Sequence, residues 1–492
     1  MQINTPFLTG FPTLLCGSNK KTNQEIAATK FQALQLKDGG ELSQQLQHEI
    51  PAQLLSKHSE STRERVYTDI VVFWAFLGQI LSEDMSCKKA VSRVRQWFRR
   101  KGRKEPAADT ASYCEARMRL PVEMLRAANT HLVDQLDREL PQDSLWRGFH
   151  VYAEDGTSVQ APDTEANQEV FPQPSSQAEG CGFPAVGLVG LVNLGHGGLK
   201  DFSCDEADGS EHKGHQENLV HLSSGDLLIG DRLYSSYEII AGLMSKEVAY
   251  IGRPHGSRKI DFRKGKKIAK NQRLVKWEKP RHQSPKSLLD KEEWDALPNE
   301  LEIRLIKTMG PDRDGKKRTL YVISTLIDVD LYPVEEILSL YAHRWEIEMN
   351  FRDIKTTMKM EMLRTKSPAM IEKEILMFMI AYNAIRLLML KAGNLAGVNH
   401  RRISFKATLQ ILDESRVNFV DIACHPRLLK TERHALLSEI ADHVVKERPG
   451  RNEPRKKKLR PKAYGWIQKP RHQYFEHFTD NNPPSKILDQ RT

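Results

Sequence analysis

One predicted helix carries four side chains whose types and spacing suit chemistry on a phosphodiester. The sequence Tyr341-x2-Arg344-x3-Glu348-x6-Lys355 combines a phenol, a guanidinium, a carboxylate and an ammonium. At ~100° per residue, these side chains project within an arc of about 60°. A helix face that carries an acid among such groups is too polar to pack in a hydrophobic core. It suits a face that contacts a phosphate, with the acid in its middle as a metal ligand.

Two further acids follow predicted strands. Residues 149–153 read as a strand that ends at Asp155, and the apolar strand 227–230 ends at Asp231. Acids at the carboxyl ends of adjacent strands are placed to hold a cation at the sheet edge. We therefore expect Asp155, Asp231 and Glu348 to be the catalytic and metal-binding residues. Either aspartate alone could instead be a turn or helix-cap residue.

Several less favoured candidates lie near this set in the sequence. His212 and His215 fit polar positions on a helix or loop better than metal ligands. Glu154 adjoins the first acid, but on a strand it faces the opposite side. Asp163 is an alternative acid. Trp277 could stack on an unpaired base or lie buried in the core of its own segment.

The positive charge of the chain is concentrated in three segments. The 492 residues carry a net charge of +10, yet 253–281 and 446–471 carry +10 and +9, and 93–104 has seven Lys or Arg and no acid. The rest of the chain is therefore acidic. Localised positive charge fits an extended polyanion, so nucleic acid is the favoured partner. Any one patch alone could be a solvated loop or tail.

Composition argues against several other classes of protein. Hydrophobic residues make up 39% of the chain, which is enough for a folded core. The longest apolar stretch, 375–390, is interrupted by Asn383 and Arg386, so we expect no membrane span. The first residues lack the basic start of a signal peptide. Six scattered cysteines without a Cys-x-x-Cys pair favour a reducing cytosol over a disulfide scaffold or a structural zinc site.

Hydrophobic periodicity predicts the elements that must position these side chains. Short amphipathic helices with basic faces, typical of a DNA-binding region, are predicted within 66–80, 90–98 and 121–136. A buried strand is predicted at 185–194, and four more strands are predicted within 245–325. Two long helices follow, at 333–358 and 369–391. The Pro- and Lys-rich tail from 448 is predicted to be irregular.

The spacing of the four helix residues, downstream of Asp155-Gly-Thr and Gly-Asp231-Arg, resembles the signature of DDE transposases of bacterial insertion sequences. The branch is the insertion-sequence-four family. The resemblance covers about residues 60–480 in layout. It implies an α/β fold, with a ribonuclease-H-like catalytic core and a β-rich insertion, flanked by helical N- and C-terminal regions. In that family the triad matches Asp155, Asp231 and Glu348.

The resemblance and the patterns together predict five regions. They are a helical N-terminal DNA-binding region (1–145), the first part of the ribonuclease-H-like core (146–244), the β-rich insertion (245–325), the second part of the core (326–400), and a helical C-terminal region with a basic tail (401–492).

The activity that the resemblance implies is cut-and-paste transposition. Such an enzyme binds the terminal inverted repeats of its element and catalyses metal-dependent DNA strand cleavage and strand transfer. Hard oxygen ligands favour two Mg²⁺ ions, with Mn²⁺ as a substitute. Tyr341, Arg344 and Lys355 would bind DNA phosphates. The implied partners are double-stranded DNA, as element ends and target, and a second copy in a homodimer assembled on DNA, in the bacterial cytoplasm at the nucleoid.

Three alternatives remain open at the level of sequence. The first is a metal-dependent nuclease of the same fold, which cuts DNA but does not join it. The second is a catalytically silent transposase-derived DNA-binding protein, although the chain keeps all three acids. The third is a glycosidase that uses a pair of carboxylates, which would leave the basic segments unexplained.

Overall fold

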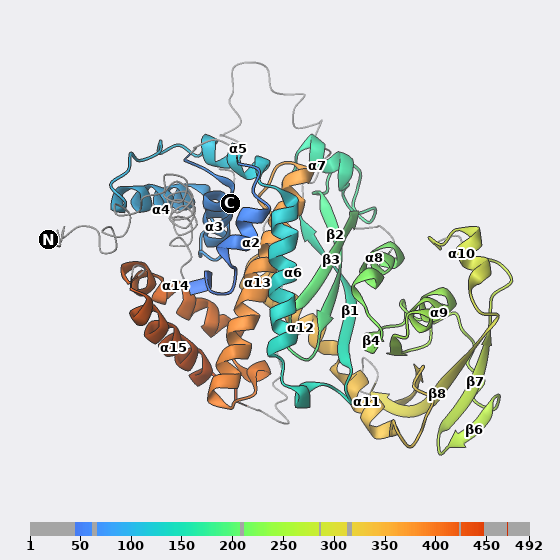
Figure 1. The fold of residues 1–492 in the computed structure, drawn as a ribbon. Coiled ribbons are helices and arrows are strands. Elements are labelled where there is room, and N and C mark those ends of the chain that lie inside the picture. The colour runs from blue at the N-terminus through green and yellow to red at the C-terminus, as the bar shows by residue number, and fades with distance from the viewer. Residues whose placement is uncertain are drawn as a thin grey trace, which may run out of the picture. The chain divides into compact units, whose positions relative to one another are not determined.

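The computed structural model describes residues 45–61, 66–206, 211–284, 287–311, 317–422, 425–446 and 470. The chain divides into two compact units (Figure 1). Unit 1 comprises the described residues of Met1–Leu132 and Ala407–Asp442, and unit 2 those of Val133–Lys406 and His443–Thr492. Most of the basic tail lies outside the described residues. The five regions predicted from the sequence stay a prediction.

Unit 1 is helical around a buried helix. That helix, α3 (Asp69–Ile80), begins at the N-cap Thr68, whose side chain accepts from the amide of Val71, and eleven of its twelve residues are buried. The other helices of the unit are α2 (Ala52–Lys57), α4 (Cys87–Arg100), α5 (Ala111–Arg119), the first part of α6 (Val122–Glu139), most of α14 (Phe405–Asp421) and α15 (Pro426–Asp442).

Three arginines of α4 have partners within unit 1. Arg95 and Arg99 pair with Glu105 at 2.9 and 2.6 Å. Arg93 lies 3.8 Å from Asp413 and donates to the carbonyl of Gly78. These three guanidiniums therefore have acceptors inside the folded unit.

Unit 2 is built on one nine-stranded, mixed sheet of order β3-β2-β1-β4-β5-β9-β8-β7-β6. Its strands are β1 (His150–Gln160), β2 (Ala185–Asn193), β3 (Leu199–Glu206), β4 (Asp226–Gly230), β5 (Ala249–Gly252), β6 (Lys266–Ala269), β7 (Gln272–Glu278), β8 (Glu300–Pro311) and β9 (Lys317–Ser324). β4 runs parallel to both β1 and β5, and the other pairings are antiparallel. The expected α/β class is confirmed.

The strands from 266–324 continue the sheet rather than forming a separate one. β9 joins β5 through two residue pairs, Ile251 with Ser324 and Gly252 with Ile323. β8 then pairs with β9 along its length, and β7 and β6 follow. Strand pairing is thus continuous from β1 and β4, next to the two aspartates, through β5 to β9, β8, β7 and β6.

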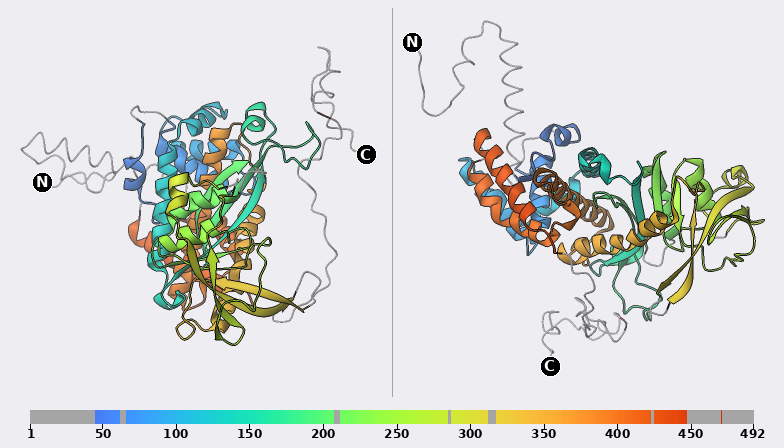
Figure 2. Two further views of the ribbon diagram at one scale, coloured as in Figure 1. Left: turned by 90° about the vertical axis from the view of Figure 1, so that its right-hand side faces the viewer. Right: turned by 90° about the horizontal axis from the view of Figure 1, so that it is seen from below.

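Helices cover both faces of the strands that carry the aspartates (Figures 1 and 2). Val189 and Gly190 are adjacent on β2, so they face opposite sides. Val189 packs on Gly214 of α8 (Glu211–Asn218), and Gly190 packs on Phe351 of α12 (Glu346–Arg352). The helix α9 (Tyr237–Ser245) shares a hydrophobic cluster with Tyr152 on the α8 side. Further helices are α7 (Glu165–Val170), α10 (Lys291–Ala296) and α11 (Val334–Ala342).

The longest helix, α13 (Pro368–Ala396), is a core helix of unit 2. By length and composition it could cross a membrane, but 89% of its most apolar window is buried inside the protein. Its two polar interruptions have protein partners. Asn383 exchanges two 2.8 Å hydrogen bonds with the backbone of Leu199, and Arg386 pairs with Asp353 at 2.9 Å. Buried polar groups satisfied in this way are typical of a protein interior.

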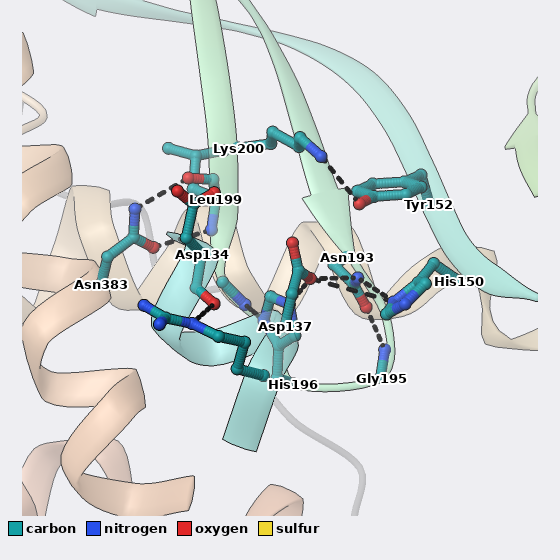
Figure 3. A network of polar contacts seen from close by, with 12 residues as sticks. Asp134, Asp137, His150, Tyr152, Asn193, Gly195, His196, Leu199, Lys200 and Asn383 are labelled. Carbon is teal, nitrogen blue, oxygen red and sulfur yellow. Dashed lines mark hydrogen bonds and ion pairs between the residues drawn. The ribbon is translucent and has the colours of Figure 1, made fainter. Parts of the chain in front are cut away.

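A polar network fixes the C-terminal part of α6 against the start of β1 (Figure 3). Nε2 of His196 lies 2.9 Å from the carboxylate of Asp137, and its Nδ1 accepts from the amide of Gly198. Because Nδ1 is an acceptor, Nε2 carries the proton and is not free to bind a metal. Lys200 of β3 donates to the hydroxyl of Tyr152 on β1 at 3.1 Å. The network is therefore structural.

Two elements differ from their predictions, one in extent and one in shape. The prediction that the first strand ends at Asp155 is wrong, because β1 goes on pairing with β2 as far as Gln160. The predicted helix 333–358 is not a uniform α-helix. A 3₁₀ turn, η5 (His343–Trp345), separates α11 from α12, and a π-helical turn spans Asp353–Thr357. Contacts of the π turn with α13 and β1 hold it in that form. The strands β3 and β6 were not predicted.

Candidate active site

Asp155 on β1 and Asp231, directly after β4, lie at the same end of the parallel pairing between these two strands. The last registered pair of β1 and β4 is Ala153 with Ile229, and each aspartate comes two residues later. Neighbouring strands lie about 4.8 Å apart, so the two acids share one edge of the parallel ladder. Each carboxylate accepts a local amide hydrogen bond, Asp155 from Gly156 at 2.9 Å and Asp231 from Leu233 at 2.7 Å.

Arg344 connects the first aspartate to Glu348. Its Nη1 lies 3.5 Å from Oδ2 of Asp155, and its Nη2 lies 3.6 Å from Oε1 of Glu348. The two nitrogens of a planar guanidinium are about 2.3 Å apart, which limits the separation of these carboxylate oxygens to about 9.5 Å. The side chain of Glu348 is 63% exposed, compared with 24% for both Asp155 and Arg344. Glu348 is therefore the solvent-facing member of the set.

The turn that carries Arg344 is held by a neighbouring ion-pair cluster. Glu346, the first residue of α12, contacts Nδ1 of His343 and the guanidinium of Arg401. Arg401 also donates to the carbonyl of Leu194 at the end of β2. Burial lowers the pKa of Arg401 to about 10, so this arginine is still charged at neutral pH. The cluster fixes η5, and with it Arg344, against the sheet.

Lys355 lies along β1, on the same side as Asp155. Its Nζ donates to the hydroxyl of Thr157 at 3.0 Å and to the carbonyl of Ser158 at 2.6 Å. Thr157 is two residues beyond Asp155, so both side chains lie on one face of the strand. The ammonium thus contacts β1 on the face that carries Asp155.

Arg253 is a site residue that the sequence analysis missed. Gly230 of β4 pairs with Gly252 of β5, so Arg253 stands beside Asp231 as Asp231 stands beside Asp155. Burial raises the pKa of the Tyr341 phenol, and the charges of Arg344 and Arg253 oppose that shift. Tyr341 therefore lies close to both guanidiniums. A signal existed in the sequence, because Gly-Arg253 follows an apolar strand just as Gly-Asp231 does.

The less favoured candidates have other surroundings. Glu154 faces the α8 side and is buried against His215. The exposed Asp163 accepts from Gln168 at 2.9 Å. Trp277 is only 5% exposed, and the guanidinium of Arg258 covers its ring at 3.7 Å from the centroid. That burial favours a core role for Trp277. The side chain of His212 lies outside the described part of the chain.

The donor types at this edge fit a hard divalent cation. Asp155 and Asp231 offer carboxylate oxygens from neighbouring positions, which are the ligands that Mg²⁺ prefers. Among the described residues, no three His, Cys, Asp or Glu groups already converge closely enough to hold a metal. The guanidinium of Arg344 lies between the first and third acids instead. Side-chain movement of Arg344 and Glu348 would complete the set.

Comparison with known proteins defines the class. Residues 146–384 match the family described as "Transposase DDE domain", a range that contains Asp155, Asp231 and Glu348. The chain is similar to the transposase InsG for insertion sequence element IS4 of Escherichia coli (strain K12), with 26% identity over 402 residues. That alignment covers 77% of this chain and 85% of the relative. Among solved structures, the cryo-EM piggyBac transposase synaptic complex with hairpin DNA matches at 11% identity and a TM-score of 0.39. That match covers 86% of this chain and 87% of the other.

The family model and the relative both support a DDE transposase of the insertion-sequence-four type, the family that the Tyr-Arg-Glu-Lys spacing resembles.

Proposed function

We propose that this transposase cuts DNA at the ends of its own insertion sequence and joins those ends to a target by cut-and-paste. The observation that carries the proposal is the geometry of three carboxylates. Asp155 and Asp231 each come two residues after the last registered pair of β1 and β4, and Arg344 contacts both Asp155 and Glu348. The substrate is double-stranded DNA of the bacterial chromosome, so the site of action is the nucleoid.

The catalytic core is proposed to be ribonuclease-H-like. Support comes from the strand order β3-β2-β1-β4-β5, with an antiparallel three-stranded meander followed by two parallel strands. Helices lie on both faces, and the acids sit at the carboxyl ends of the parallel pairing. The strands β6–β9 would then be an insertion between the second and third acids.

Asp155, Asp231 and Glu348 would hold two Mg²⁺ ions, or Mn²⁺ as substitute. When bound, two such ions activate a water molecule and stabilise the leaving 3′ oxygen. Arg344 has a specific part in this proposal. It balances the charge of Asp155 and Glu348 in the arrangement described above, and it would turn toward a DNA phosphate when the carboxylates take up the metal.

The cations around the triad would position the scissile phosphate. Arg344, Lys355 and Arg253 offer three positive charges at one edge, and Tyr341 offers a hydroxyl that can donate to a phosphate oxygen. After cleavage, the freed 3′ hydroxyl would stay in the same site and attack a target phosphate. That attack forms the new phosphodiester bond and releases the 3′ oxygen of the target strand.

Cleavage of a labelled duplex that carries the element end tests the proposal. Asp155→Ala, Asp231→Ala and Glu348→Ala should each abolish Mg²⁺-dependent cutting while end binding is retained. The control is Asp163→Ala, which removes an exposed acid outside the set and should cut normally. Undiminished cutting by any of the three variants would remove that residue from the triad.

The assembled form is proposed to be a homodimer on two DNA ends, because two ends must be cut and joined to nearby target phosphates. Sizing with end-containing duplexes should give a complex of two subunits and two ends. Mixing Glu348→Ala subunits with wild type should give complexes that cut one of two paired ends. Cutting of both ends by a complex that holds a single subunit would contradict the arrangement.

A different assay distinguishes a transposase from a nuclease that cuts DNA but does not join it. Pre-cut ends with free 3′ hydroxyls are incubated with target plasmid. A transposase yields joined products, whereas a nuclease of the same fold leaves the ends unjoined.

A further inference from the structure

A buried polar cluster lies directly behind the first aspartate, on the other face of β1. Glu154 is 1% exposed, and one of its carboxylate oxygens contacts Nδ1 of His215 on α8. The other oxygen accepts from Asn218 at 2.8 Å, and Asn218 also donates to the carbonyl of Val189 on β2. The cluster therefore ties β1, β2 and α8 together at the level of Asp155.

The same cluster reaches the loop that follows the second aspartate. The ring of His215 packs on the ring of Tyr234, with centroids 5.6 Å apart. Tyr234 is fully buried and comes three residues after Asp231. The next residue, Ser235, donates to the carbonyls of both Arg232 and Arg253. A continuous set of contacts thus links Glu154 to the loop that begins at Asp231.

Burial of the Glu154 carboxylate costs free energy that an apolar side chain at the same position would not cost. A buried carboxylate must be compensated by partners, and removal of one partner leaves an uncompensated charge. Within the described part of the chain, Nε2 of His215 is buried and has no hydrogen-bond partner. Close packing also restricts α8, because a Cβ at Gly214 would lie 2.3 Å from Oγ of Ser203. Polar groups kept at such cost commonly position a neighbouring functional group.

We propose that Glu154 and His215, with Asn218, are positioning residues that set the separation of Asp155 and Asp231. The inference rests on the proposed metal-dependent function. The contacts of Glu154 fix β1 one residue before Asp155, and His215 packs against Tyr234 in the loop that begins at Asp231. Residues that orient metal ligands from behind alter metal affinity when they are replaced, although they touch no metal.

The test measures Mn²⁺ binding by the full chain bound to a pre-cut end duplex, by electron paramagnetic resonance. Glu154→Gln and His215→Gln roughly keep side-chain volume and can still form hydrogen bonds, but each removes the carboxylate–imidazole contact. Asp137→Asn is the matched control, since it breaks another carboxylate–histidine contact in unit 2, near the start of β1. Asp155→Ala is the reference for a lost ligand.

We expect Glu154→Gln and His215→Gln to weaken Mn²⁺ binding by about tenfold. Asp137→Asn should bind Mn²⁺ as wild type does, even if all three variants melt at lower temperature. Wild-type Mn²⁺ affinity in both cluster variants, with binding lost in Asp155→Ala, would overturn the inference and leave the proposed function intact. A wild-type protein that binds no Mn²⁺ would overturn the proposed function itself. If Glu154→Gln does not fold, His215→Gln alone decides the outcome.

Discussion

Arg253 and Asp231 follow paired glycines, so a guanidinium and a carboxylate stand side by side at the carboxyl ends of β5 and β4. Neither glycine tolerates a side chain. A Cβ at Gly230 would lie 2.7 Å from the Tyr250 hydroxyl, and a Cβ at Gly252 would lie 2.2 Å from it. With Asp155 two residues beyond the last pair of β1 and β4, the edge carries two acids followed by one base. That order suits a bound cation with a phosphate beside it.

The first prediction concerns Arg253. Arg253→Ala should slow single-turnover cleavage of a bound end by at least about tenfold, the equivalent of one charge-assisted hydrogen bond of about 1.5 kcal/mol. Arg263→Ala is the control, because it removes the same charge from the same basic segment at a side chain that is 92% exposed. Equal rates for the two variants would show that Arg253 contributes only general positive charge.

The close approach of α8 to the sheet gives a prediction about stability. Gly214→Ala would place a Cβ 2.3 Å from Oγ of Ser203 and 2.6 Å from Cγ2 of Val189, so we expect a loss of about 1–3 kcal/mol. Gly242→Ala is the matched control within α9, where nothing lies within 4 Å of the added Cβ. That change should stabilise its helix by about 0.5–1 kcal/mol. Urea denaturation of both variants measures the difference, and equal midpoints would contradict the packing described.

Asp226 predicts a pH-dependent stability. Burial raises the pKa of this carboxyl above its ordinary value of 3.8, while an amide hydrogen bond from Ser223 opposes the shift. A raised folded-state pKa means that stability is fully present below pH 3.8 and is lost as pH rises through the folded-state pKa. Asp226→Asn should therefore raise the Tm at pH 7 by about 2 °C. The gain should disappear near pH 3.8. A gain that persists there would have a cause other than ionisation.

The basic tail yields a prediction about binding rather than cleavage. Truncation after Val445 removes eleven Lys or Arg between 446 and 471. Because released counterions set the salt dependence of DNA affinity, the slope of log affinity against log salt should flatten. Preference for the element end over unrelated duplex should stay the same. An unchanged slope would assign the tail a role other than general DNA contact.

The three acids are predictable because each has a local signal. Asp231 follows a short apolar strand, Asp155 follows a run rich in aromatic and branched residues, and Glu348 belongs to a spaced helical motif. The helix that carries Glu348 is predictable in position but not in shape. Its π turn depends on tertiary contacts, such as that between Asp353 and Arg386, which no local pattern encodes. The contact of Arg344 with Asp155 is equally non-local, whereas its contact with Glu348 spans only four residues.

The two missed strands share a physical reason. β3 and β6 are the edge strands of the sheet. β3 carries Asp201, Asp205 and Glu206, and β6 begins with exposed Lys266 and Lys267. Edge strands are often charged because unpaired backbone groups there would otherwise recruit other chains. Such charge masks the alternating hydrophobic pattern by which interior strands are recognised.

The pairing of β9 with β5 has a consequence for solubility. Without β9, the side of β5 that carries Ile251 and Gly252 would end the sheet with free amides and carbonyls next to the proposed catalytic residues. With β6–β9 in place, the open edge on this side of the sheet is β6, which carries exposed Lys266 and Lys267. The other edge strand, β3, carries acids. Two copies that paired through the same edge would therefore bring like charges together. The large sheet is thereby protected from growing into a shared, misassembled one.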